Sequence, residues 1–272
     1  MQLSPHILEH PAPAARVGHP TASPEGPVSD GAHAVEQNAL LRALPADEYA
    51  RLLPHLEPVE LGHAQVLWRA EAPIHSVYFP RTAVGSLLTP LADEKPVEAA
   101  TVGREGFIGT AVVLGARTTS VEAIAQIPGT AARLDAGRLT EWLRAPGALD
   151  GALLPLLLRY AQALQEQTAQ SVACNRRHGI DERCARWLLM THDRVGQDQF
   201  PLTQDFLAFM LGVRRASVTV AAGMLQQAGL IKYSRGRIAV RDRAGLEAAS
   251  CECYGVVKRK YAQLLGPEAA VG

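Results

Sequence analysis

The stretch LTQDFLAFMLGVRRASVTVAAGMLQQAGL, residues 202–230, decides the fold of the C-terminal part of the chain. Apolar residues recur at helical spacing on both sides of Gly212, and this pattern predicts two helices joined by a tight turn. Gly212 can adopt the left-handed backbone that the turn requires, and Ala208 is small enough to let the second helix approach. Thr203 is a good N-cap for the first helix. The register of these residues predicts a helix-turn-helix.

The segment that follows predicts a wing. LIKYSRGRIAV, residues 230–240, indicates two short strands with Gly236 at the tip of a hairpin. A plain three-helix interaction domain is the alternative interpretation of the helices. The side of the second helix that faces the core is expected to consist of Val218, Ala221, Ala222 and Leu225.

The charge is divided along the chain although the total is neutral. Residues 1–175 carry 12 basic and 18 acidic side chains, whereas residues 176–261 carry 15 basic and 8 acidic ones. The C-terminal part therefore attracts polyanions, and the N-terminal part does not. This split favours a nucleic-acid-binding helix-turn-helix over a protein-interaction domain.

The first turns of the second helix are the expected DNA-reading surface, because this end of such a helix enters the major groove. Arg215 is placed to contact guanine O6 and N7, while Arg214 and Ser217 are expected to hold phosphates. Ala216 and Val220 can only touch thymine methyl groups. The remaining candidate DNA contacts are Thr203, Gln204 and Thr219, with Arg235, Lys232 and Arg237 in the wing. An ordinary solvated hairpin is the alternative for the wing.

The N-terminal part of the sequence contains three successive segments that differ in composition and in the spacing of apolar residues. Residues 1–36 are rich in Pro, Ala, His and Ser and predict a disordered arm. Residues 38–56 predict two short helices interrupted by Pro45. Between residues 58 and 135, short strands separated by turn residues indicate an antiparallel sandwich or barrel.

A helix is predicted over 136–145, and a long helix follows from Leu153. Pro155 should lie near its first turn or kink it. The long helix carries an apolar stripe that indicates pairing with a second copy, the alternative being packing onto its own β domain. The expected dimer contacts are Leu153, Leu157, Tyr160 and Leu164.

This order of elements resembles the Crp/Fnr family of bacterial transcription regulators over residues 38 to about 265. The motifs that carry the resemblance are LLRALPADEYARLLPHLEPVEL (40–61), SVYFP (76–80), VGREGFIG (102–109), RCARWLLMTHDRVG (183–196) and the stretch from Leu202, with SCECY (250–254) typical of one subgroup. It implies an α+β fold with an N-terminal antiparallel, jelly-roll-like β-roll, a long dimerisation helix and a C-terminal winged helix-turn-helix. The implied domains are residues 37–146, 147–178 and 179–272.

The resemblance also implies partners: double-stranded DNA, a second copy of the chain, and RNA polymerase. A homodimer would read a pseudo-palindrome with half-sites one helical turn apart. Ala216 stands where the family usually has a glutamate, and Val220 replaces a second base-reading arginine. The family's familiar half-site is therefore not expected.

Cyclic-nucleotide-binding members of the family bind their effector at a Gly-rich turn of the β-roll. The corresponding turn of this sequence resembles theirs only in part. Gly109 is followed eight residues later by Arg117-Thr118, which matches the phosphate half of such a site. Phe107, next to Gly106, stands where the relatives have a glutamate for the ribose, and an unpaired ribose hydroxyl in an apolar slot is unfavourable. We expect no cyclic nucleotide and identify no cofactor, and Arg117 is alternatively a surface arginine.

The four cysteines indicate no metal site. Cys174, His178 and Cys184 could approach one ion, and Cys251 with Cys253 could form a redox pair. Buried free cysteines usually behave as small apolar residues, however, so no metal is expected. No cysteine precedes Cys174, so the N-terminal cluster of the oxygen-sensing branch is absent from the sequence.

Other functional classes lack sequence support. The sequence contains no Ser-His-Asp set, paired carboxylate motif, P-loop or HExxH, so no catalytic residue and no enzyme is expected. It has neither a signal-peptide pattern nor a membrane-spanning apolar run, which predicts a cytoplasmic protein. The second functional hypothesis is a ligand-binding or protein-docking β-roll without specific DNA recognition.

Overall fold

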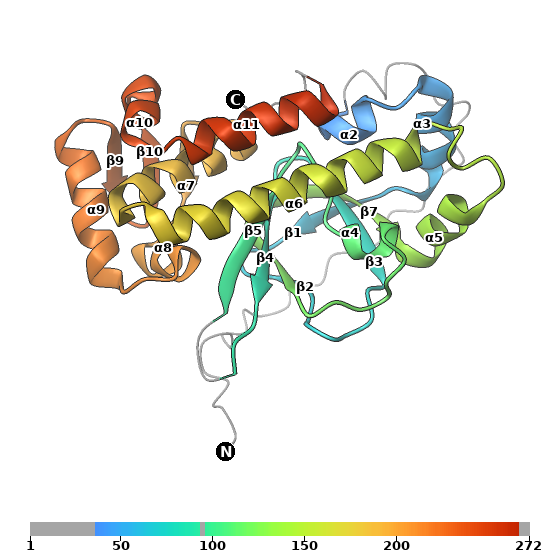
Figure 1. The fold of residues 1–272 in the computed structure, drawn as a ribbon, viewed down its shortest axis with the longest axis horizontal. Helices are drawn as coiled ribbons and strands as arrows, with labels where there is room; N and C mark the ends of the chain where they lie inside the picture. The colour runs from blue at the N-terminus through green and yellow to red at the C-terminus, as the bar shows by residue number, and fades with distance from the viewer. Residues whose placement is uncertain (1–35, 93–95, 267–272) are drawn as a thin grey trace, which may run out of the picture.

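The computed structural model describes residues 36–92 and 96–266 (Figure 1). Two short helices come first: α2 (Ala39–Arg42), capped by the Asn38 side chain, and α3 (Ala46–Leu52), which a 3-10 turn, η1 (Leu53–His55), extends. The predicted pair of helices around Pro45 is confirmed. The predicted arm lies outside the described residues except for Glu36, which is buried and forms an ion pair of 2.6 Å with Arg81.

The strands that follow form the predicted antiparallel β-roll. Their bounds are β1 (Glu57–Leu61), β2 (Val66–Trp68), β3 (Ser76–Pro80), β4 (Val84–Thr89), β5 (Val97–Val102), β6 (Glu122–Ile127) and β7 (Gly129–Asp135). The strand order is β1-β7-β3 in one sheet and β2-β6-β4-β5 in the other. A short helix, α4 (Thr110–Val113), lies between β5 and β6. Apolar side chains of both sheets meet in a core that continues under the long helix.

Helix α5 (Ala136–Arg144) leads to the 25-residue helix α6 (Leu153–Arg177), which crosses the molecule from α3 to the C-terminal domain (Figure 1). Pro155 lies in the first turn of α6, where a missing N–H costs no hydrogen bond.

The predicted dimer stripe of α6 faces inward, which corrects the sequence-based assignment. Leu157 and Tyr160 are fully buried and Leu164 nearly so, while Leu153 is half-buried against the same core. The alternative, packing onto the chain's own β domain, accounts for the stripe. A heptad pattern cannot distinguish a partner helix from an intramolecular core, because both bury one side of a helix.

The C-terminal part is a winged helix-turn-helix, as predicted. Its elements are α7 (Ile180–Val195), β8 (Gln199–Pro201), α8 (Gln204–Leu211), α9 (Arg215–Gln227), β9 (Ile231–Ser234), β10 (Arg237–Val240) and α10 (Arg243–Ala249). The three strands pair in the order β8-β10-β9. Its core includes Val84 and Ile124 of the β-roll, so the two domains share apolar contacts.

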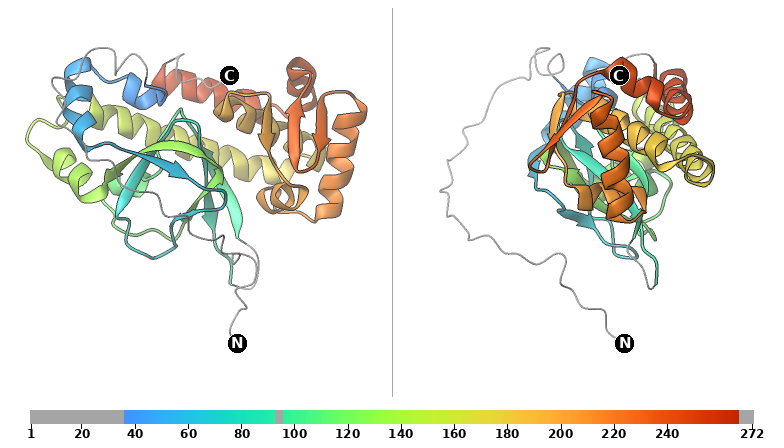
Figure 2. Two further views of the ribbon diagram at one scale, coloured as in Figure 1. Left: turned by 180° about the vertical axis from the view of Figure 1, so that it is seen from behind. Right: turned by 90° about the vertical axis from the view of Figure 1, so that its left-hand side faces the viewer.

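A last helix, α11 (Cys253–Leu265), was not predicted. It runs back from the winged domain, antiparallel to α6 and beside it (Figures 1 and 2). The ring of Tyr261 in α11 meets the ring of Tyr160 edge-on with centroids 6.3 Å apart. Tyr160 therefore lies between the β-roll core and α11.

Among the described residues, no single helix has the length and apolar character needed to cross a membrane. Helices α8 and α9 reach the required length and apolar character only when taken together, and their axes are bent by 107° relative to each other.

Candidate nucleic-acid interface and the contacts behind it

The turn between α8 and α9 has the geometry that the sequence predicts. Gly212 adopts φ 64° and ψ 38°, the left-handed region that favours glycine. Thr203 caps α8 by accepting a hydrogen bond of 3.1 Å from the Phe206 N–H. Arg183 of α7 donates to the Leu211 carbonyl at 2.6 Å, which ties the end of α8 to α7. Both ends of α8 are thus held by side-chain hydrogen bonds.

Helix α9 divides into a buried and an exposed side as expected. Val218, Ala221, Ala222 and Leu225 are all buried. The exposed side chains are Arg214, Arg215, Ala216, Thr219 and Val220, with Ser217 half-buried. Val220 is 63% exposed and lies among these side chains. The exposed side of the first half of α9 is therefore basic with an apolar centre.

Side-chain contacts between α8 and α9 position this surface. Arg215 forms an ion pair of 3.2 Å with Asp205, and both side chains are about two-thirds exposed, at 64% and 67%. Such an exposed pair contributes about 0 to 1 kcal/mol, so it orients the guanidinium without binding it firmly. Thr219 donates to Gln204 Oε1 at 2.8 Å, which fixes the predicted contacts Gln204 and Thr219 against each other. Sequence analysis missed the role of Asp205 as a partner of Arg215.

The tip of the wing, between β9 and β10, is a tight turn with two residues in left-handed backbone conformation, Arg235 at φ 50° and Gly236 at φ 71°. Two positive φ values define the type I′ hairpin turn, which normally takes Asn or Gly. An arginine in this region costs about 1 kcal/mol, yet it places a cation at the tip. Lys232 and Arg237 are exposed beside it. Tyr233 donates its N–H to Gln226 Oε1 at 2.8 Å and so links the wing to α9.

Solved structures share the whole arrangement of domains. They include FixK2 from Bradyrhizobium japonicum (15% identity, TM-score 0.58, 72% of this chain and 98% of that one). The CRP-family transcriptional regulator TTHB099 from Thermus thermophilus matches at 17% identity and TM-score 0.57, over 71% of this chain and 96% of that one. The c-di-GMP responsive global regulator CLP from Xanthomonas campestris matches at 17% identity and TM-score 0.55, over 72% and 99%. At these identities the likeness shows the fold.

The C-terminal domain also matches a family in sequence. Residues 182–249, from the first turn of α7 to the end of α10, match the family model of the Crp-like helix-turn-helix domain. This segment is a Crp-like helix-turn-helix domain. A domain of this family implies DNA binding. No curated protein was found to match the sequence.

The predicted effector residues are divided between the interior and the surface. Phe107 is fully buried, and its ring centroid lies 5.6 Å from that of Phe79 and 5.2 Å from that of Tyr160. Gly106 touches the same ring, since a Cβ at this position would lie 2.1 Å from Tyr160 Cε2. Gly109 has φ 140°, which favours glycine. Aromatic rings therefore fill the space beside the Gly-rich turn.

Arg117 and Thr118, the predicted phosphate half of the effector site, are exposed. A cavity of about 350 Å³ lies elsewhere in the chain, between α3, α5 and the start of α6. Glu48 and Trp142 are among the residues that line it, and the predicted effector residues are not.

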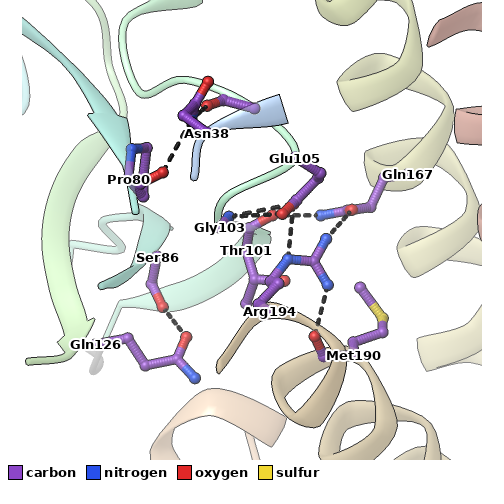
Figure 3. Close-up of polar contacts among 11 residues, drawn as sticks. Asn38, Pro80, Ser86, Thr101, Gly103, Glu105, Gln126, Gln167, Met190 and Arg194 are labelled. Carbon is purple, nitrogen blue, oxygen red and sulfur yellow. Dashed lines mark hydrogen bonds and ion pairs between the residues drawn. The ribbon is translucent and has the colours of Figure 1, made fainter. Parts of the chain in front are cut away.

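A buried polar network connects the β-roll, α6 and α7 (Figure 3). Arg194 of α7 donates to Glu105 Oε1 at 2.8 Å and to Gln167 Oε1 of α6 at 2.9 Å. Glu105 also accepts the Gly103 N–H at 3.1 Å. Gln167 in turn donates to the Thr101 carbonyl at 2.9 Å. We call Glu105, Gln167 and Arg194 the interdomain latch. Glu105 belongs to the VGREGFIG motif, so this motif supplies a contact between domains that sequence analysis missed.

Glu98 forms a second contact between the β-roll and α7. Trp187 donates to Glu98 Oε1 at 2.8 Å, and Ser86 Oγ lies 2.6 Å from both Glu98 Oε2 and Gln126 Oε1. Burial raises the pKa of Glu98 to about 7 against the opposing effect of hydrogen bonds from Ser86 and Trp187. The Ser86 hydroxyl has one proton, so it can donate to only one of these two oxygens at a time.

Proposed function

We propose that this chain is a Crp/Fnr-type transcription regulator that binds pseudo-palindromic double-stranded DNA as a homodimer, with α9 of each chain in the major groove. The observation that carries the proposal is the exposed, basic first half of α9, which lies at the end of the molecule farthest from the β-roll (Figure 2). The N-terminus of α9 and the wing cations add positive potential on this side of the domain.

Each exposed side chain then has a role that follows from its chemistry. Arg215 reads guanine O6 and N7 after leaving Asp205, an exchange that costs little because the pair is exposed. Arg214 and Ser217 hold phosphates at the helix start, together with Thr203 and Gln204. Ala216 and Val220 contact thymine methyl groups, and Arg235 grips the backbone beside the major groove.

Dimerisation uses the outward side of α6, which replaces the inward stripe of the sequence analysis. Leu158, Gln165 and Val172 are spaced seven residues apart and are exposed, Leu158 at 38% and Val172 at 68%. Ala161 and Thr168 are half-buried at the second position of this heptad. The pattern fits a coiled-coil seam with a second copy, and that pairing would bury the apolar side chains that a single chain leaves in water.

Replacing Val172 by glutamate, alone or with Leu158→Glu, should convert the dimer to a monomer at micromolar concentration. Two like charges would face each other in the seam, and desolvating them is unfavourable. Light scattering after size exclusion measures the mass. Leu91→Glu is the control, because Leu91 is 46% exposed and lies two residues after the end of β4, outside α6. A dimer that survives both changes in α6 would show that the copies associate elsewhere.

Selection of bound fragments from random duplexes tests the function as a whole. We expect enrichment of two inverted half-sites with centres about 34 to 36 Å apart, one helical turn. The recovered half-site should contain a guanine that depends on Arg215. If the folded dimer enriches no sequence, the second hypothesis, a docking β-roll without specific DNA recognition, replaces this one.

The β-roll serves as the sensing or docking part in this proposal. Phe107 and Tyr160 occupy the space beside the Gly-rich turn, so we do not assign a cyclic nucleotide to it. RNA polymerase in the cytoplasm is the partner that the family resemblance implies for an activated dimer.

A further inference from the structure

Four metal-ligand side chains from two distant parts of the sequence meet where α6 ends and α11 begins. Cys174 lies in the last turn of α6, His178 caps that helix, Cys251 precedes α11 and Cys253 is its first residue. Their ligand atoms all lie within 4.8 Å of one another. The three cysteines are buried and form their own small cluster. Cys184, which sequence analysis grouped with Cys174 and His178, lies in the core of the winged domain.

We propose that Cys174, His178, Cys251 and Cys253 form a tetrahedral site for one thiolate-preferring divalent ion of the zinc class. Zinc binds sulfur at about 2.3 Å and imidazole nitrogen at about 2.0 Å, which puts tetrahedral ligand atoms about 3.5 to 3.8 Å apart. The Sγ atoms of Cys174 and Cys251 are 3.5 Å apart, and Cys253 Sγ is 3.5 Å from His178 Nδ1. The ligands are thus arranged for an ion with little movement.

The groups around the cluster suit a metal site. Nε2 of His178 lies 3.1 Å from a carboxylate oxygen of Glu252. A carboxylate on the second ring nitrogen is the usual partner of a metal-bound histidine, and it leaves Nδ1 for the ion. Gln170 Nε2 donates to Cys253 Sγ at 3.0 Å, a bond that stabilises a thiolate.

The occupied site would carry a negative charge next to two arginines. Three thiolates, a neutral histidine and a divalent cation sum to one negative charge. Arg183 interacts electrostatically with Cys174 and Cys251, and Arg186 with Cys174. The Nε atoms of both arginines are buried without a hydrogen-bond partner among the described residues. Buried cations need a compensating charge, which the occupied site provides.

The compact arrangement distinguishes a single ion from other cysteine chemistry. In a cluster of two or four irons the four ligands are shared among several irons, so the ligand atoms are spread more widely than here. A disulfide between Cys174 and Cys251 would use only two of the four groups and leave Cys253 and His178 without a role. One tetrahedral ion uses all four.

The position of the site gives it a mechanical consequence. Two extended residues, His178 and Gly179, separate α6 from α7. An ion that joins the end of α6 to the start of α11 would limit rotation of the winged domain about this connection. This consequence rests on the proposed function, because it predicts that the occupied site holds α9 in its DNA-binding orientation.

Titration of the reduced, metal-free full chain with Co²⁺ tests the site without DNA. About one equivalent should bind, with the thiolate-to-cobalt charge-transfer band and d–d bands of a tetrahedral site, and Zn²⁺ should displace it. Cys253→Ser and His178→Ala should each weaken Zn²⁺ binding about 100-fold or more. Cys184→Ser is the matched control and should bind as the unchanged chain does. A chain without these bands, or Cys253→Ser with both affinity and bands unchanged, overturns the proposal.

Thermal unfolding separates loss of the site from loss of the fold. Zn²⁺ should raise the Tm of the unchanged chain and of Cys184→Ser but not that of His178→Ala, whose half-buried side chain can be removed without opening the core. A disulfide between Cys174 and Cys251 in the Zn²⁺-treated chain would also contradict the site.

Removing Zn²⁺ should weaken binding to the selected duplex at least about tenfold, a coupling of the usual size between two sites. Equal affinity for the duplex with and without Zn²⁺ would show that the ion does not hold α9 in its DNA-binding orientation. It would leave the metal site itself intact. A chain that binds Zn²⁺ as expected but selects no duplex in either state would instead contradict the proposed function.

Discussion

Replacing Arg194 by methionine should lower the free energy of unfolding by about 3 to 5 kcal/mol. Arg194 is 4% exposed and Glu105 is fully buried, so the substitution leaves a carboxylate without its cation in the interior. It also leaves Gln167 Oε1 without its donor. Because the latch joins α7 to the β-roll and α6, we expect the β-roll and the winged domain to unfold less cooperatively. Urea unfolding followed by Trp fluorescence and circular dichroism measures both effects.

A double variant and a control separate the buried charge from simple loss of contacts. Arg194→Met with Glu105→Gln removes both charges, so much of the loss should be recovered. Arg133→Met breaks a pair with Glu57 that is slightly shorter, 2.6 Å, but these side chains are 40% and 60% exposed. We expect this control to cost less than about 1 kcal/mol. If Arg194→Met costs no more than Arg133→Met, the latch does not hold the domains together.

Replacing Arg215 by alanine should remove about 1 to 3 kcal/mol of discrimination for the cognate guanine, roughly tenfold to 100-fold in affinity per half-site. Binding to random duplexes should change much less, because the lost contact is made to a base and not to the phosphate backbone, which all duplexes share. Asp205→Ala, which removes the partner of Arg215 in the free protein, should leave specific binding equal or slightly tighter. Fluorescence anisotropy with the selected and a scrambled duplex measures each affinity.

The matched comparison is Arg235→Ala in the wing. This side chain is expected to contact the backbone, so its loss should weaken binding to all duplexes alike. It should also reduce the magnitude of the log–log salt slope by about 0.9 per chain, or about 1.8 per dimer. Equal losses on cognate and scrambled duplexes for Arg215→Ala would show that Arg215 is not a base-reading residue.

Local sequence patterns were sufficient to predict the elements of the helix-turn-helix and most strands of the β-roll. The buried side of α9, the turn at Gly212 and the strands between residues 57 and 135 follow from periodicity and from backbone preferences. Each of these signals acts over a few residues. Helix α11 was missed because VVKRKYAQLL has a weak pattern, and its apolar side is defined by contact with Tyr160.

The partners of buried groups could not be predicted. The pair of Glu105 and Arg194 and the cluster of Cys174 with Cys251 join residues 89 and 77 positions apart. Among the cysteines, sequence analysis grouped Cys184 with Cys174 and His178, but Cys184 lies in the core of the winged domain, where burial raises the pKa of its thiol to about 12. Spacing within a helix says nothing about which distant segment packs against it.

By itself the sequence determined the kind of each domain and which end of the chain carries positive charge, because helix period, turn chemistry and charge are local properties. Only the tertiary structure decided which side of α6 is free for a partner, where VGREGFIG makes its contacts, and that three cysteines and a histidine meet beside Gly179. These outcomes depend on α11 returning along α6 and on the close packing of the β-roll with α7. Such contacts are set by shape and burial over the whole chain, which no short segment encodes.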